Sequence, residues 1–430
     1  SAGDNTAVTS AGDGLAAWSS PAFVANPTNA EQLVVAGRLD RPQLGAGLRR
    51  STDGGKAWSD VALPLPAGES RAFAPDAAFD AAGGLYVTYV TLSDPANNPT
   101  GLWLARSSDG GASFAAPTKV AGPYGFQPRV VVSGSNVHVS FVQASAAVES
   151  LHNGFGPPPN PVVMASSADG GTSFAAPVAV SDPARPRVGA ATPVVGSGGA
   201  VYVLYSDYGD DAVDLEGQPG PTHAGRFSLV LARSADGAQR FDTLGVVDDA
   251  LVPTGRFNPY TPAYASLAVD TAAPDNDVLY VAWSDARGGD ADVFVRRSTD
   301  EGASWAAPVR VNADDEADQY LPVASVAPSG RVDVAYLDRS ADARNTLATA
   351  ALATSFDIGD TWSTLVVSDT SFDSGVGPEA VGGGTDPGSR IGLISRADSA
   401  LAVWTDTRNG NADSGRTDLF FAPIRIVPET

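Results

Sequence analysis

Arginine, histidine and aspartate side chains recur in this 430-residue chain where they could bind an anion, move a proton or hold a metal. A guanidinium group can donate two parallel hydrogen bonds to a carboxylate or a sulfate, so several around one point form an anion site. The alternative is that each arginine pairs with an acidic neighbour and serves only the fold. Five candidates for substrate binding stand just ahead of segments that read as short β-strands: Arg71, Arg129, Arg187, Arg256 and Arg390.

Two of the three histidines, His152 and His223, lie in long polar segments of the chain. These segments, 143–160 and 206–226, are rich in glycine and proline, and long loops on a rigid scaffold commonly form binding surfaces. A histidine beside a tyrosine or a carboxylate can act as acid or base in hydrolysis or β-elimination. Both histidines are therefore candidate catalytic residues, and a solvated loop side chain is the alternative.

Acidic loops could hold calcium, which takes about six to eight oxygen ligands. Their spacing does not fit the EF-hand pattern, and repeated Asp–Arg pairs, such as Asp285 with Arg287, offer a purely structural interpretation. Calcium is the one cofactor that the sequence suggests, and no organic cofactor is indicated. The candidate metal ligands are three aspartates in each of two loops: Asp285, Asp290 and Asp292, and Asp406, Asp413 and Asp418.

The composition limits the classes of function. Lysine and arginine number 27 against 49 aspartates and glutamates, which gives a net charge of −22. Such a charge repels polyanions and anionic lipid surfaces, so nucleic-acid binding is not expected. No run of eighteen apolar residues could span a bilayer, so membrane insertion is not expected either. The absence of cysteine excludes disulfides, a thiol nucleophile and thiolate metal sites. We expect an extracellular protein, secreted by means of a signal peptide that has been removed.

An internal repeat indicates which elements position these residues. The pattern Ser-x-Asp-x-Gly-x-x-aromatic occurs six times, and one copy has Ala238 in place of its glycine. In each copy we expect the aspartate to accept hydrogen bonds from backbone amides of a turn, and the glycine to take a positive φ. The motif is therefore structural rather than catalytic. Its copies begin at Ser51, Ser107, Ser167, Ser234, Ser298 and Ser355.

Short alternating strands surround each copy of the motif. The clearest unit begins at residue 74 with APDAAFD and continues through LYVTYV and LWLARSS to the motif and PTKVAG. Four strands in up-and-down order make one blade of a β-propeller. Second strands of this kind occur seven times, at 33–40, 85–90, 137–142, 201–207, 279–285, 332–338 and 401–406.

The count of second strands exceeds the count of motifs by one. The last unit, from about Ile391, has no motif and no fourth strand, whereas NTAVTS at 5–10 resembles the fourth strands elsewhere. We predict an all-β, seven-bladed propeller that comprises residues 1–430 as a single domain. In it the N-terminal strand completes the last blade and removes its open edge. Six blades plus a terminal hairpin is the alternative.

The six motifs, with second strands that end in Trp/Tyr-x-Asp, resemble the sialidase-like propellers built from BNR or Asp-box repeats, over about 20–425. The resemblance implies a site at the channel mouth, opposite the motifs. It also implies an acid/base aspartate before the first motif, where Asp40 stands, and a nucleophilic tyrosine, for which Tyr320 is the candidate. Sialidases hold the substrate carboxylate with three arginines, one in a Phe/Tyr-Arg-Ile-Pro motif. The corresponding stretch here, SSPAFVANP at 19–27, has no arginine.

Together these features predict a carbohydrate-active propeller, either a glycoside hydrolase or a polysaccharide lyase, that acts on an anionic glycan at the channel mouth. The alternative is a non-catalytic propeller that binds a glycan or a cell-surface protein through the same face. We expect a monomer in either case.

Overall fold

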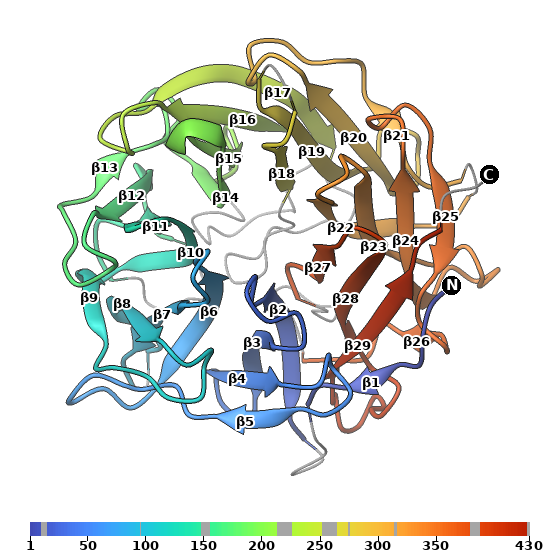
Figure 1. The fold of residues 1–430 in the computed structure, drawn as a ribbon, viewed down its shortest axis with the longest axis horizontal. Coiled ribbons are helices and arrows are strands. Elements are labelled where there is room, and N and C mark those ends of the chain that lie inside the picture. The colour runs from blue at the N-terminus through green and yellow to red at the C-terminus, as the bar shows by residue number, and fades with distance from the viewer. Residues whose placement is uncertain are drawn as a thin grey trace.

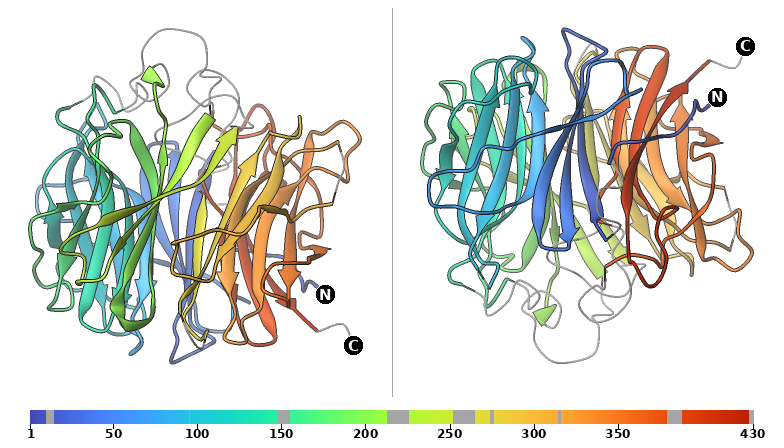
Figure 2. Two further views of the ribbon diagram at one scale, coloured as in Figure 1. Left: turned by 90° about the horizontal axis from the view of Figure 1, so that it is seen from above. Right: turned by 90° about the horizontal axis from the view of Figure 1, so that it is seen from below.

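The alternating apolar residues of the repeats form strands, and the strands form seven antiparallel sheets arranged as the blades of a propeller (Figure 1). This computed structural model describes residues 1–9, 15–94, 96–147, 155–212, 226–251, 265–273, 276–313, 316–378 and 388–427. In the side views the strands stand side by side around the ring and run roughly along the axis (Figure 2). The predicted fold class and blade number are confirmed, and the six-bladed alternative is wrong.

Each blade is a run of consecutive strands, counted from the axis outward. The first three blades are β2 (Ala17–Ala25), β3 (Leu33–Arg41), β4 (Gly45–Ser51) and β5 (Ser59–Val61); β6 (Ala72–Phe79), β7 (Leu85–Leu92), β8 (Pro99–Ser107) and β9 (Thr118–Ala121); and β10 (Gly125–Ser133), β11 (Asn136–Gln143), β12 (Val162–Ser167) and β13 (Val178–Ala179). Blades 4 and 5 are β14 (Val188–Val195), β15 (Val201–Asp207), β16 (Arg226–Ser234) and β17 (Asp242–Leu251); and β18 (Ser266–Asp270), β19 (Val278–Asp285), β20 (Asp292–Ser298) and β21 (Val309–Arg310).

The last two blades depart from this simple order. Blade 6 has an extra short strand that pairs with its third strand, and blade 7 takes its outer strand from the N-terminus. No helix in the described ranges is long and apolar enough to cross a membrane. The strands are β22 (Gln319–Val326), β23 (Val332–Asp338), β24 (Leu347–Ser355), β25 (Ser363–Val366) and the extra β26 (Phe372–Asp373); and β27 (Gly392–Ser395), β28 (Ser399–Asp406), β29 (Asp418–Arg425) and β1 (Thr6–Ala7).

The N-terminal strand closes the ring as predicted. Thr6 lies opposite Phe421 of β29 in an antiparallel pair. Thr9 extends this contact, because its Oγ1 donates to Asp418 Oδ1 (2.9 Å) and accepts the amide of Leu419 (3.0 Å). Blade 7 therefore joins the two ends of the described chain.

The six Ser-x-Asp motifs form nearly identical turns between the third and fourth strands. In blade 2, Ser107 Oγ donates to Asp109 Oδ1 (2.7 Å) and accepts the amide of Gly111 (2.8 Å). The amide of Ser113 donates to Asp109 Oδ1 (2.9 Å). Hydrogen bonds from Ser113 and Ser107 hold the pKa of Asp109 well below its usual range. The aspartate side chain therefore stabilises its own turn, as expected for a structural motif.

Each turn also packs against the preceding blade, which ties neighbouring blades together. The Arg106 guanidinium of blade 2 donates to the carbonyl of Gly170 in the turn of blade 3 (3.1 Å). A Cβ on Gly171 in that turn would lie 2.5 Å from Leu104 of blade 2. In blade 1 the same position, Gly55, faces Phe421 of blade 7, so the first turn packs against the last blade.

The turn of blade 6 contains a strained residue. Ile358 has a φ of 56° at a position where four of the six turns have glycine. A non-glycine residue in this region costs roughly 1–3 kcal/mol. Ile358 is 47% exposed and loses little packing on truncation. We expect Ile358→Gly to raise the free energy of unfolding by roughly 0.5–1 kcal/mol in urea denaturation.

The neighbouring Phe356, which is 54% exposed, offers a control for this substitution. Phe356→Ala should change the free energy of unfolding by less than about 0.5 kcal/mol. A loss of stability in Ile358→Gly would contradict the assignment of strain to this turn.

The inner strands of five blades have a β-bulge near their beginning. At each bulge a residue other than glycine takes a left-handed conformation, and in four cases a proline follows. The bulge bends the strand and frees backbone groups for contacts between blades. For example, the amide of Ala190 donates to Gln127 Oε1 of the preceding blade (2.8 Å). The bulge residues are Ser20, Ala74, Gln127, Ala190 and Leu321.

Candidate anion-binding site

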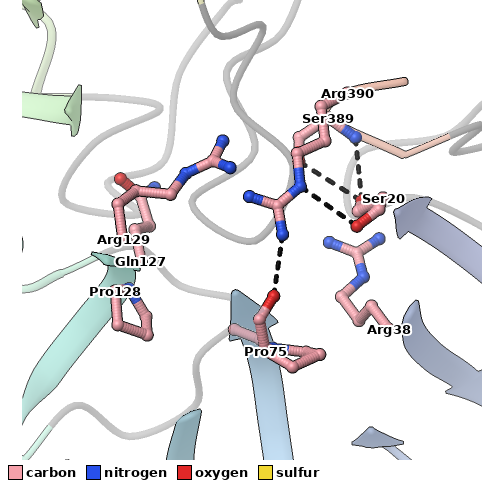
Figure 3. A pocket seen from close by; sticks show the side chains of 9 residues that line it. Ser20, Arg38, Pro75, Gln127, Pro128, Arg129, Ser389 and Arg390 are labelled. Carbon is pink, nitrogen blue, oxygen red and sulfur yellow. Dashed lines mark hydrogen bonds between the residues drawn. The ribbon is translucent and has the colours of Figure 1, made fainter. Parts of the chain in front are cut away.

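Three arginines from different blades line one pocket where the inner strands begin (Figure 3). Arg38 comes from β3 of blade 1, Arg129 from β10 of blade 3, and Arg390 from the segment just before β27 of blade 7. In Figure 3 their guanidinium groups point toward a common space. The other lining residues come from the bulges and their neighbours: Ser20, Ala74, Pro75, Gln127, Pro128 and Ser389.

Arg390 is fixed by the bulges of two other blades. Its Nε donates to the carbonyl of Ser20 (3.1 Å) and its Nη2 to the carbonyl of Pro75 (2.7 Å). Its Nη1 lies 3.0 Å from Asp76 Oδ1, and its side chain is 13% exposed. These contacts hold the guanidinium group in place before any ligand arrives, which lowers the entropic cost of binding an anion.

Arg129 and Arg390 share the carboxylate of Asp76, a residue of the inner strand of blade 2. Arg129 Nη1 lies 3.4 Å from Asp76 Oδ1, and the amide of Val130 donates to Oδ2 (2.9 Å). Burial raises the pKa of Asp76 to about 6, although Arg129 and the backbone amides of Val130 and Ala77 act in the opposite direction. Asp76 is thus the counter-ion of this pair of arginines.

Arg38 is almost completely buried and pairs with Asp40. Its Nε lies 2.7 Å from Asp40 Oδ1, and its Nη2 donates to Oδ2 at 3.2 Å. Ser19 Oγ also donates to Asp40 Oδ2 (2.7 Å). The aspartate expected to be an acid/base therefore lies beside the pocket, as the partner of one of its arginines.

Two of the other arginines that the sequence suggested, Arg71 and Arg187, do not line this pocket. Arg71 bonds to Asn97 Oδ1 (2.8 Å), the carbonyl of Ser93 (3.0 Å) and Asp94, and it lines a separate hollow beside blade 1. Arg187 donates to the carbonyl of Gly209 (3.4 Å). Arg256 lies outside the described residues.

The positions of these arginines along the inner strands explain why Arg71 and Arg187 lie apart from Arg129. Arg71 and Arg187 immediately precede β6 and β14, whereas Arg129 lies past the bulge of β10, opposite Ser140. Asp76 occupies the equivalent place in β6, opposite Thr88. The recurrence of arginine ahead of the strands was therefore not a structural equivalence.

Tyr320, the remaining candidate catalytic residue that the structure describes, is not among the residues that line this pocket. Tyr320 of β22 is 6% exposed and packs between blades 6 and 7, with the Arg339 guanidinium 5.1 Å from its ring centre. Burial raises the pKa of its hydroxyl. His152 and His223 lie outside the described residues. The third histidine, His138, is buried in β11 with its Nδ1 2.8 Å from Ser166 Oγ.

Two of the acidic loop residues brace their loops through arginine. Asp285 accepts hydrogen bonds from Arg287 Nε (2.8 Å) and Trp283 Nε1 (3.1 Å). Asp406 has the same arrangement in blade 7, with Arg408 Nη2 at 2.7 Å and Trp404 Nε1 at 3.0 Å. The repetition of this pattern in two blades fits the structural interpretation of the Asp–Arg pairs.

The other candidate metal ligands have protein partners or lie in turns. Asp292 accepts a bond from Asn312 Nδ2 (2.8 Å), and Asp418 from Arg416 Nε (2.9 Å). Asp290 lies in the turn between β19 and β20, and Asp413 in an exposed turn before β29. Within the described ranges, no three histidine, aspartate or glutamate side chains form a group that could hold a metal ion.

Comparison with known proteins adds evidence about the fold. No protein-family model and no curated protein matches the chain. An ulvan lyase, from a new family of polysaccharide lyases, is 12% identical with a TM-score of 0.54 over 94% of each chain. A protein of unknown function from Dyadobacter fermentans DSM 18053 is 13% identical, with a TM-score of 0.49 over 98% of each chain. The Hadza microbial sialidase Hz136 is 14% identical, with a TM-score of 0.47 over 94% of this chain and 76% of its own. The likeness to the ulvan lyase concerns the fold alone.

Proposed function

We propose that this propeller is a carbohydrate-active protein that binds an anionic glycan through the pocket of Arg38, Arg129 and Arg390. The observation that supports it most is the meeting of three guanidinium groups from three blades in a chain with a net charge of −22. Buried arginines are costly unless they serve the fold or a ligand, and these three face one common space (Figure 3). Carboxylates and sulfates are the groups that such an arrangement binds best.

The small pocket and the negative charge of the whole protein favour a sugar with a carboxylate or sulfate group over a nucleic acid. A nucleic acid would meet the negative field of the whole protein, whereas one carboxylate or sulfate group can enter a small pocket. A structure of the ulvan lyase bound to -[GlcA(1-4)Rha3S]-, a glycan with a uronic acid and a sulfated sugar, matches this chain with a TM-score of 0.53. That ligand supports uronates and sulfated sugars as the first to test. An extracellular location is part of this proposal.

The proposal extends to cleavage of the bound glycan, by hydrolysis or by β-elimination. Either reaction needs a proton-transferring group, and Asp40, which the resemblance suggested as an acid/base, pairs with Arg38 of the pocket. Incubation with polyuronates, sulfated glycans and sialosides tests it. New reducing ends would indicate a hydrolase, and unsaturated uronate ends a lyase. Binding without either product would favour the non-catalytic alternative.

Loss of either Arg129 or Arg390 should weaken anion binding. We expect Arg129→Ala and Arg390→Ala each to reduce the affinity for glucuronate or a sulfated monosaccharide about 10- to 100-fold in calorimetry, because each removes charge-assisted hydrogen bonds. The free energy of unfolding is measured alongside, since both variants remove a partner of Asp76.

Arg240→Ala is the matched control, because Arg240 is 75% exposed in the turn of blade 4 and its loss changes the net charge equally. It should leave the affinity within about twofold, since distant exposed charges are screened. Folded Arg129→Ala and Arg390→Ala proteins that bind both probes as tightly as the unaltered protein would contradict the proposed function.

A further inference from the structure

One buried carboxylate is the counter-ion of two arginines that line the proposed ligand pocket. Asp76 Oδ1 lies 3.0 Å from Arg390 Nη1 and 3.4 Å from Arg129 Nη1, and the Asp76 side chain is 11% exposed. The described lining residues include three arginines and no acidic side chain. An anion that binds to these arginines therefore competes with Asp76 for the same guanidinium groups.

We propose that the pocket takes up one proton together with its anionic ligand, and that Asp76 is the group that accepts this proton. The inference rests on the proposed function and adds a chemical condition to it. The proton comes from the solvent and forms an O–H bond with the Asp76 carboxylate. No other covalent bond changes.

The reason is the proximity of two negative charges. An anion oxygen at hydrogen-bond distance from Nη1 of Arg129 or Arg390 lies within about 6 Å of Asp76 Oδ1. The two anions repel each other and compete for the same guanidinium groups, so one of them takes a proton. Asp76 is the one that does so, because its burial already disfavours the charged form.

The groups around Asp76 leave no other proton acceptor in the described part of the pocket. Blade 3 contributes Arg129 and the amide of Val130, and blade 7 contributes Arg390. Arg38 of blade 1 lines the same pocket, and its charge is matched by Asp40. The residue opposite Asp76 on β7 is the neutral Thr88. Asp40 stays paired with Arg38 and Ser19, so Asp76 is the residue that responds to the ligand.

This coupling makes affinity depend on pH in a defined direction. In the free protein Asp76 has a pKa of about 6, so it is mostly ionised near pH 7.5 and mostly protonated near pH 5. Binding near pH 7.5 therefore takes up close to one proton, and binding near pH 5 takes up almost none. The affinity should rise about tenfold per pH unit as the pH falls toward 6.

The test is calorimetry of the full chain with glucose 6-sulfate, whose sulfate group stays ionised throughout this pH range. Titrations in buffers of different ionisation enthalpy count the protons taken up. We expect close to one near pH 7.5 and almost none near pH 5. Asp76→Asn should show no uptake at either pH and should bind near pH 7.5 about as tightly as the unaltered protein near pH 5. The control Asp242→Asn, at a side chain that is 68% exposed, should keep the uptake.

The possible outcomes distinguish failure of this inference from failure of the proposed function. Binding near pH 7.5 without proton uptake overturns the inference and leaves the proposed function intact. Uptake that persists in Asp76→Asn overturns the assignment to Asp76. Absence of binding at both pH values overturns both the inference and the proposed function for this ligand. If Asp76→Asn does not fold, the proton count of the unaltered protein decides the matter.

Discussion

Arg331→Ala should lower the free energy of unfolding by about 3–5 kcal/mol, because it leaves a buried carboxylate without its cation. Arg331 and Asp333 are 2% and 0% exposed, and Nη2 of the first lies 2.8 Å from Oδ2 of the second. The same guanidinium group donates to the carbonyls of Arg396, Ala397 and Ser399 at 2.9 Å each. It therefore also joins blade 6 to the first hairpin of blade 7.

Urea denaturation compares the loss of stability in Arg331→Ala with the loss at an Arg–Asp pair that is exposed to solvent. Arg240 and Asp242 are 75% and 68% exposed and lie 3.3 Å apart. Arg240→Ala should cost at most about 1 kcal/mol. The double replacement of Arg331 and Asp333 by methionine and leucine should recover part of the loss, because it removes both buried charges. Equal effects of Arg331→Ala and Arg240→Ala would show that the buried network does not stabilise the ring.

Gly55→Ala should destabilise the closure of the ring by about 2–4 kcal/mol. Gly55 has a φ of 93°, and a Cβ there would lie 2.3 Å from Cε1 of Phe421. Phe421 is 2% exposed and also meets the ring of Trp58 edge-on at 5.7 Å. The added methyl group must therefore displace either the turn of blade 1 or β29 of blade 7, which contains Phe421.

Gly237→Ala separates the steric effect from the backbone effect. Gly237 has a φ of 75°, and nothing lies within 4 Å of a Cβ built there. Its replacement should cost only the backbone strain, about 1–2 kcal/mol. Thermal or urea unfolding of both variants gives the difference. A loss in Gly55→Ala no larger than in Gly237→Ala would mean that the turn of blade 1 does not pack tightly on blade 7.

The fold followed from the sequence because strand alternation and turn chemistry are local. The segments 201–207 and 279–285, for example, were expected as second strands and lie within β15 and β19. The closing role of the N-terminal strand was also predictable, since the last unit had no fourth strand. Repetition made these patterns recognisable, because each blade repeats the same local choices.

The site was only partly predictable because its residues meet across blades. Arg129 and Arg390 were identified, but nothing in one sequence separated them from Arg71 and Arg187. That difference depends on the bulges, which shift the register of each inner strand. The prolines after Ser20, Ala74, Gln127 and Leu321 are the sequence signal of these bulges.

Arg38 and Asp76 were not identified from the sequence, although each had a detectable signal. Asp76 is a charged residue in the otherwise apolar inner strand Ala72–Phe79, AFAPDAAF. Arg38 occupies a place in the second strand where the other six blades have uncharged residues. Counted by register, these are Val90, Val142, Ser206, Ser284, Leu337 and Thr405.

A crystal structure of the protein with glucuronate or glucose 6-sulfate tests the central claim most directly. The proposed function predicts that the carboxylate or sulfate lies in the pocket of Figure 3, within hydrogen-bond distance of Arg129 and Arg390 and close to Arg38. At saturating ligand, an empty pocket, or an anion bound only elsewhere on the propeller, would contradict it.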